Sequence, residues 1–178
     1  MIPRRQLGFG LIEAMVTVAI LAILLSVALP SFQQMIVNGR TRTIAESFRA
    51  GVDLARTEAM RRNLPVTFRV VSSGCTASSS GTSWVVFAGS ACSDTTLVQR
   101  FDGSGTGAGT TVSANQTDVS FGGMGMVASA GLTSRISQID FGNSLPTTQQ
   151  RKLRLTISAG GQSRLCDPGV ASGDPRAC

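Results

Sequence analysis

The chain has 178 residues and a formal net charge of +6, and it contains neither histidine nor tyrosine. This length leaves room for one domain with a modest core once an N-terminal helix is set aside. Because histidine is the usual general base and the commonest metal ligand, its absence argues against an enzyme, and we expect no cofactor and no metal site.

The first element along the chain is an unbroken apolar run, residues 14–29, with the carboxylate of Glu13 directly before it. Counted from Phe9, the segment has about the 20 residues that a helix needs to cross a bilayer. A carboxylate in hydrocarbon is costly unless a cation pairs with it, so we predict a cationic partner for Glu13, and an N-terminal amine fits best. An ordinary signal peptide or a simple membrane anchor is the alternative, and the apolar run alone would permit either. A signal peptide is disfavoured because residues 29–32 offer no small-residue cleavage pattern.

The segment from Arg4 to Glu13 resembles the class III signal of type IV pilins and pseudopilins, with Gly8 and Phe9 at the cleavage position. The resemblance implies that a prepilin peptidase cuts between Gly8 and Phe9 and N-methylates Phe9. It also implies that Glu13 pairs with the new terminal amine during assembly. The chain then divides into a leader (residues 1–8), an N-terminal helix (residues 9–62, of which about 9–32 cross the membrane) and a β-rich head (residues 63–178).

After the apolar run, the spacing predicts that the helix continues as an amphipathic helix. Proline at position 30 is tolerated in a membrane helix, so we expect a kink there and not a stop. The helix should end near Arg62, since Pro65 disfavours helix in the residue before it. One buried stripe is predicted from apolar residues at three- and four-residue steps: Phe32, Met35, Ile36, Ile44, Phe48, Val52, Ala55 and Ala59.

The end of this helix carries a second resemblance. The stretch from Ala55 to Asn63, followed by Pro65 and a strand, is similar to the GspH/FimT/FimU group of minor pilins and pseudopilins. The resemblance implies a pilin-like fold in which this helix leads directly into the first strand.

Beyond the helix, short segments rich in β-branched and aromatic residues alternate with Ser/Gly-rich turns, which favours antiparallel sheets. The predicted fold is therefore α+β, with the long helix laid across a β-sheet head. The expected strands are residues 66–71, 84–87, 97–101, 110–112, 119–121, 136–141 and 153–157.

Four cysteines, Cys75, Cys92, Cys166 and Cys178, are an even number in a chain sent to an oxidising compartment, so we predict disulfides. Three pairings are possible. We favour Cys75 with Cys92 and Cys166 with Cys178, because each pair closes a loop of the size that staples a hairpin or a terminal tail. Zinc is disfavoured, since the spacing lacks C-x-x-C and no histidine is present.

The C-terminal segment around Arg164 corresponds to the stretch through which some FimT-type pilins bind DNA by a basic G-R-x-R tail. Here Gln162 replaces the first arginine of that motif. DNA binding needs clustered cations for phosphate contacts. The candidate DNA-binding residues are Arg151, Lys152, Arg154 and Arg164; alternatively, Arg164 supports the final strand and the Cys166–Cys178 loop shapes the tail for contact with a neighbouring subunit.

We expect a minor pilin that helps to initiate type IV pilus assembly and sits in or near the tip complex. A DNA-binding minor pilin for natural transformation and a type II secretion minor pseudopilin are the alternatives. Arg4 and Arg5 place the N-terminus in the cytoplasm, so the head should be periplasmic and later reach the cell surface. The implied partners are other minor and major pilins, the prepilin peptidase, the inner-membrane assembly platform and the inner membrane.

Overall fold

The computed structural model describes residues 10–89, 91–128 and 135–178, which form two units, one ending at Ile36 and one spanning Val37–Cys178. The leader, residues 1–8, and the processing residues Gly8 and Phe9 lie outside the described residues. One helix, α1 (Leu11–Arg62), belongs to both units and runs through position 30 without ending. It leads directly into β1, with Asn63 in the left-handed region at φ 51°. A left-handed Asn is a common helix end.

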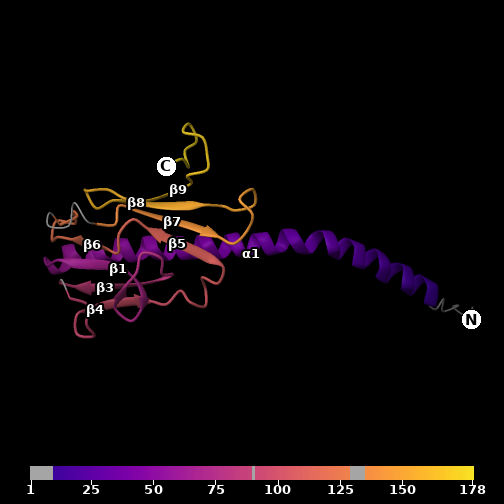
Figure 1. The fold of residues 1–178 in the computed structure, drawn as a ribbon, viewed down its shortest axis with the longest axis horizontal. Helices are drawn as coiled ribbons and strands as arrows, with labels where there is room; N and C mark the ends of the chain where they lie inside the picture. Colours follow the sequence, from indigo (N-terminus) through magenta and orange to yellow (C-terminus); the bar gives the residue numbers. More distant parts are fainter. Residues whose placement is uncertain (1–9, 90, 129–134) are drawn as a thin grey trace, which may run out of the picture. The chain divides into compact units, whose positions relative to one another are not determined.

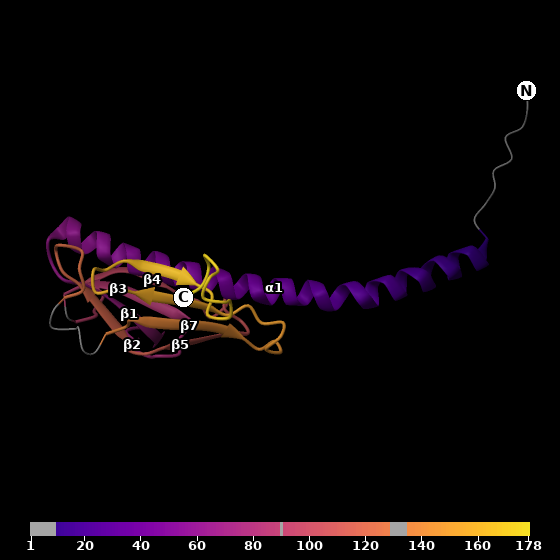
Figure 2. The ribbon, with the colours of Figure 1, turned by 90° about the horizontal axis from the view of Figure 1, so that it is seen from above.

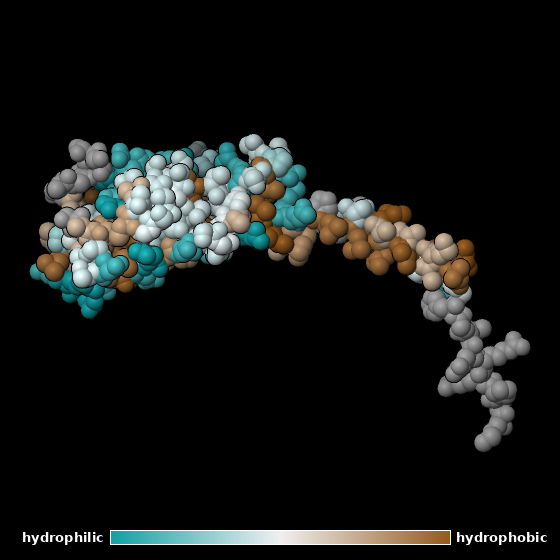
Figure 3. Space-filling model, turned by 60° about the horizontal axis from the view of Figure 1, so that its bottom comes forward, coloured by the Kyte–Doolittle hydropathy of each residue, from teal (hydrophilic) through white to brown (hydrophobic). Residues whose placement is uncertain are grey.

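In the first unit, α1 exposes large apolar side chains along its length, and Figure 3 shows them in brown. By length and composition alone, this helix could cross a membrane. Phe32, Met35 and Ile36 were expected in the buried stripe, but they are 62%, 75% and 41% exposed. They precede Val37, where the unit that contains the sheets begins, and they continue the exposed apolar surface instead.

In the second unit, α1 runs along both sheets (Figures 1 and 2). Five residues of the predicted stripe are fully buried: Ile44, Phe48, Val52, Ala55 and Ala59. Apolar side chains at this spacing share one face of a helix, which confirms the amphipathic pattern.

The strands form two antiparallel sheets, which confirms the α+β, pilin-like fold. In the first sheet the order is β2-β1-β3-β4, and β6 also pairs with β1; in the second it is β5-β7-β8-β9. The strands are β1 (Val66–Ser73), β2 (Thr76–Ala77), β3 (Ser83–Ala88), β4 (Leu97–Phe101), β5 (Thr110–Ala114), β6 (Asp118–Phe121), β7 (Gln138–Asn143), β8 (Leu153–Ile157) and β9 (Ser163–Cys166). Two of them, β2 and β9, were not predicted.

The aromatic core joins the helix to both sheets. The ring of Phe48 lies 6.0 Å from that of Phe68 on β1 and 5.3 Å from that of Phe141 on β7, each edge to face. Gly51, one turn further along α1, lies so close to the first sheet that a Cβ there would be 2.8 Å from the Phe68 ring and 2.9 Å from Trp84. Only glycine allows this approach.

Candidate assembly helix and basic surface

Glu13 lies in the first turn of α1, where Gly10 begins the hydrogen bonding. The Gly10 carbonyl accepts from the amides of Glu13 at 3.1 Å and Ala14 at 3.2 Å. The Glu13 side chain is exposed, and no cation of the described chain pairs with it. Leu11 and Ile12 beside it are 82% and 74% exposed. The start of α1 thus places an exposed carboxylate beside exposed apolar side chains, and no described part of the chain covers either of them.

A polar cluster fixes the start of the second unit. Asn143, at the end of β7, is only 5% exposed and donates to Asn38 Oδ1 at 3.0 Å and to Thr41 Oγ1 at 3.1 Å. Asn38 Oδ1 also accepts from the backbone amide of Arg151 at 3.0 Å. These bonds hold the segment that leads into β8 against α1, and so position the basic residues that follow.

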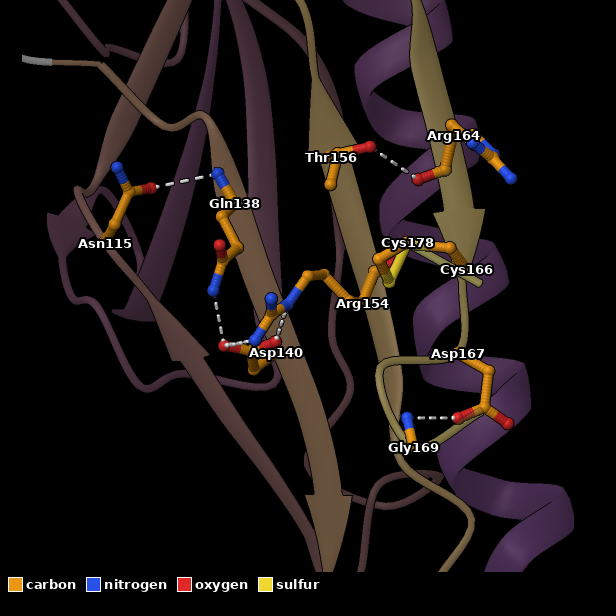
Figure 4. Close-up of polar contacts among 10 residues, drawn as sticks. All are labelled: Asn115, Gln138, Asp140, Arg154, Thr156, Arg164, Cys166, Asp167, Gly169 and Cys178. Atoms are coloured by element: carbon orange, nitrogen blue, oxygen red, sulfur yellow. Dashed lines mark hydrogen bonds and ion pairs between the residues drawn. A yellow bond between two sulfur atoms is a disulfide. The ribbon is translucent and has the colours of Figure 1, made fainter. Parts of the chain in front are cut away.

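Arg154 is neutralised on the outer face of the second sheet. Its Nε donates to Asp140 Oδ1 at 2.6 Å and its Nη2 to Asp140 Oδ2 at 3.3 Å (Figure 4). Asp140 also accepts from Gln138 Nε2 at 2.7 Å. The register pairs Asp140 with Arg154 across β7 and β8, so the two side chains share a face. A paired guanidinium offers less charge to a phosphate.

Arg164, on β9, is also engaged. Its Nη2 donates to the carbonyls of Pro175 at 3.2 Å and Ala177 at 2.9 Å. Cys166 and Cys178 are joined by a disulfide, with their Cα atoms 5.1 Å apart. Arg164 and this disulfide together fold the C-terminal tail back beside β9.

Arg151 and Lys152 are exposed, and neither forms an ion pair with any residue of the described chain. Lys152 lines an open hollow with Asp140 and Arg154, whereas Arg151 lines a separate groove with Arg42 and Arg176. The four candidate DNA-binding residues are therefore divided among separate hollows, because Arg164 lines a third one with Arg49 and Arg56. Only Arg151 and Lys152 carry a charge without an intramolecular partner among the described residues.

The other two cysteines, Cys75 and Cys92, form the second disulfide, with their Cα atoms 5.9 Å apart. Both disulfides join the pairs that loop size favoured. Each cysteine of the described chain is paired.

Glu58 near the end of α1 holds two arginines. It accepts from Arg61 at 2.8 Å and from Arg62 at 2.6 Å, and these bonds lower the pKa of its carboxyl from 4.5 to about 2. In the C-terminal loop, hydrogen bonds from Arg176 likewise lower the pKa of Asp174 to about 2. Both carboxylates are therefore paired with arginines of the same chain and offer no unpaired negative charge to a ligand.

Comparison with known families identifies the chain. The family model described as "Type II transport protein GspH" matches residues 45–161, more than half of the sequence. The chain belongs to the GspH family. A second model, the prokaryotic N-terminal methylation motif, matches residues 3–29 of this GspH-family chain. No curated protein sequence matches this chain significantly.

Among solved structures, the chain is similar to the type IV minor pilin FimU of Pseudomonas aeruginosa (strain PAO1). A crystal structure in space group P21 is 17% identical with a TM-score of 0.53, and the match covers 76% of this chain and 95% of that one. A second crystal form, in P65, is 16% identical with a TM-score of 0.49, and covers 75% and 98%. At this identity the first likeness shows the fold alone.

The methylation motif and the GspH match together make this chain a GspH/FimT/FimU-type pilin, which confirms both resemblances seen in the sequence. The family is one of type IV minor pilins and pseudopilins, and its members are structural subunits. Membership implies an N-terminal membrane anchor and assembly with other pilins.

Proposed function

We propose that this chain is a minor pilin that enters a type IV pilus through its N-terminal helix, near the tip, and helps to initiate assembly. The observation that carries the proposal is Glu13, an exposed carboxylate on a helix whose large apolar side chains, where the structure describes them between Leu11 and Ile36, are exposed. In an assembled filament, other helices would cover this apolar surface and the terminal amine of a neighbour would neutralise Glu13. Both contacts are then needed. Neutralising Glu13 alone would leave the apolar side chains exposed, and packing the helix alone would bury an unpaired carboxylate.

Processing and topology belong to the same proposal. Cleavage between Gly8 and Phe9 supplies the amine, and N-methylation marks it. Mass spectrometry of the N-terminal peptide from purified pili should show Phe9 as the first residue, carrying one methyl group. An intact leader in assembled pili would contradict this step. Before assembly, the chain would sit in the inner membrane with a cytoplasmic N-terminus and a periplasmic head.

The test of incorporation is Glu13→Ala in the native host, with Glu46→Ala as the matched control. Glu46 lies on the same helix, and its bond to Arg42 is an exposed i,i+4 pair that contributes little. Sheared pili and membranes are immunoblotted for the chain. We expect Glu13→Ala to accumulate in membranes and be depleted from pili, while Glu46→Ala is incorporated normally. Equal incorporation of both variants would contradict the proposal.

A pseudopilus of type II secretion is the second candidate, and the description of the matching family supports it. The same helix and the same Glu13 would serve either machine. Deletion of the gene distinguishes them: loss of surface pili with normal secretion supports the pilin, and loss of protein secretion with normal pili supports the pseudopilin. The two disulfides fit either machine, because such bonds persist both in the periplasm and at the cell surface.

DNA binding is a third candidate, supported by the exposed cations Arg151 and Lys152. It is tested by fluorescence anisotropy of residues 37–178 with duplex DNA, at low and near-physiological salt. If phosphate contacts are made, Arg151→Ala with Lys152→Ala should weaken binding and its salt dependence, and Asp140→Asn, which frees Arg154, should strengthen it. No binding at either salt concentration would exclude this function for the isolated head.

A further inference from the structure

A groove of about 280 Å³ lies within the unit Val37–Cys178, between α1 and the C-terminal loop, which projects beyond β9 in Figure 1. Leu153 of β8 and Leu165 of β9 line it, and both are half-buried side chains that pack against the core. Three arginines from three separate segments line it as well: Arg42, Arg151 and Arg176. Together they make a groove with an apolar surface and a cationic rim.

The rim has a positive excess. Three arginines and only one carboxylate, that of Asp167, line the groove. Asp167 Oδ1 accepts a hydrogen bond from the Gly169 amide at 2.9 Å (Figure 4). Arg42 is paired with Glu46, and Arg176 with Asp174, so both are partly neutralised. Arg151 is the lining arginine that forms no ion pair with any described residue. An anionic group that enters the groove can therefore pair with Arg151 without displacing a carboxylate of the described chain.

The wall of the groove is built in advance. Pro175 and Arg176 stand on a loop held by the Cys166–Cys178 disulfide. The bonds from Arg164 to the carbonyls of Pro175 and Ala177, and the bond from the Asp167 amide to the Arg176 carbonyl at 2.8 Å, fix it further. A preformed wall lowers the ordering cost of binding. Arg164 is thus a positioning residue for this groove.

We propose that this groove docks a segment of a neighbouring pilin subunit that carries an aliphatic side chain beside a carboxylate. The aliphatic group packs on Leu153 and Leu165, and the carboxylate pairs with Arg151, with Arg42 close by. Charge complementarity selects this partner: Arg151 lacks an acid, and the leucines favour an apolar contact over a sugar-phosphate backbone. The inference rests on the proposed function, since it needs the chain to stand beside other pilins.

The test is site-specific photo-crosslinking in piliated cells, with p-benzoylphenylalanine replacing Pro175 on the groove wall. We expect a covalent adduct with another pilin, on a peptide where Asp or Glu lies within a few residues of Leu, Ile or Val. Arg151→Glu should lower the yield of this adduct about tenfold or more, because it sets two carboxylates against each other. The matched control is Arg100→Glu, which makes the same change at an exposed arginine of β4 in the other sheet and should leave the yield unchanged.

A compensating charge reversal in the partner distinguishes loss of the ion pair from misfolding of the Arg151→Glu variant. Changing the acid of the crosslinked peptide to Arg should restore the adduct to Arg151→Glu. The inference is overturned if the chain is present in sheared pili but Pro175 crosslinks to no pilin, or if the adduct forms equally with Arg151→Glu. If the wild-type chain is absent from pili, the proposed function fails, and the inference fails with it.

Discussion

Arg164 donates a hydrogen bond of 2.9 Å to the carbonyl of Ala177, the residue before the C-terminal cysteine. A second bond from the same nitrogen reaches Pro175 at 3.2 Å. The arginine that corresponds to a DNA-binding motif in related pilins is therefore used here to hold the chain's own tail. The alternative left open by the sequence was that Arg164 supports the final strand, whereas its side chain bonds to the C-terminal tail.

Replacing Arg164 should loosen the tail more than the rest of the fold. Arg164→Ala removes both bonds, and we expect a loss of about 1 kcal/mol of stability, as for exposed bonds of this kind. Hydrogen exchange should quicken at the amides of Asp167 and Ala177, which bond within the tail. Arg100→Ala is the control, since Arg100 is exposed and forms no ion pair with any described residue, so its loss should change stability by less than about 0.5 kcal/mol. Unchanged exchange in Arg164→Ala would show that the disulfide alone holds the tail.

The two disulfides should differ in their effect on global stability. The Cys75–Cys92 bond closes a loop with a sequence separation of 17 inside the head, so its replacement by serines should cost about 3 kcal/mol in urea unfolding. The Cys166–Cys178 bond ties down the chain end, with a separation of 12. Without it the tail can detach in the folded protein too, so we expect a global loss of only about 1 kcal/mol. An equal loss from both double variants would contradict this view.

Asn143 should be one of the most sensitive polar positions. Its buried side chain bonds to Asn38 and Thr41 on α1, and its Oδ1 accepts from the Leu145 amide at 3.1 Å. Asn143→Ala removes all three bonds, and we expect a loss of about 2 to 3 kcal/mol in urea unfolding of residues 37–178. Gln149→Ala, at an exposed neighbouring position, should change stability by less than about 0.5 kcal/mol. A loss below about 1 kcal/mol in Asn143→Ala would show that the polar cluster is dispensable.

Periodicity in the sequence was enough to predict α1 and most of the head. The buried stripe from Ile44 to Ala59 follows helical spacing, and Pro65 marks the exit where α1 ends at Arg62. Strands β4 and β8 begin and end at the predicted residues because each is a clear β-rich segment between turns. These features depend on residues that are close together in the chain, so they can be predicted from a single sequence.

Features that depend on pairing across the fold could not be predicted. β9 has the sequence Ser-Arg-Leu-Cys, with little β propensity, and it is a strand because β8 pairs with it. The neutralisation of Arg154 depends on the register that sets Asp140 opposite it. Likewise, nothing in the sequence brings Arg42 beside Arg151 and Arg176, which come from distant segments. A count of the basic residues in the sequence therefore overestimates how much unpaired positive charge this surface carries.

Glu58 should make stability depend on pH in acid. The hydrogen bonds from Arg61 and Arg62 lower its pKa to about 2, against an ordinary value of 4.5. A lowered pKa means that the folded state binds fewer protons than the unfolded state, so the contribution is fully present above pH 4.5 and is lost as the pH falls toward about 2. Glu58→Gln should be less stable than the wild type near neutral pH, and the difference should shrink through this window. Urea unfolding of residues 37–178 at several pH values measures it. A difference that stays constant down to about pH 2 would show that Glu58 acts through packing and not through its charge.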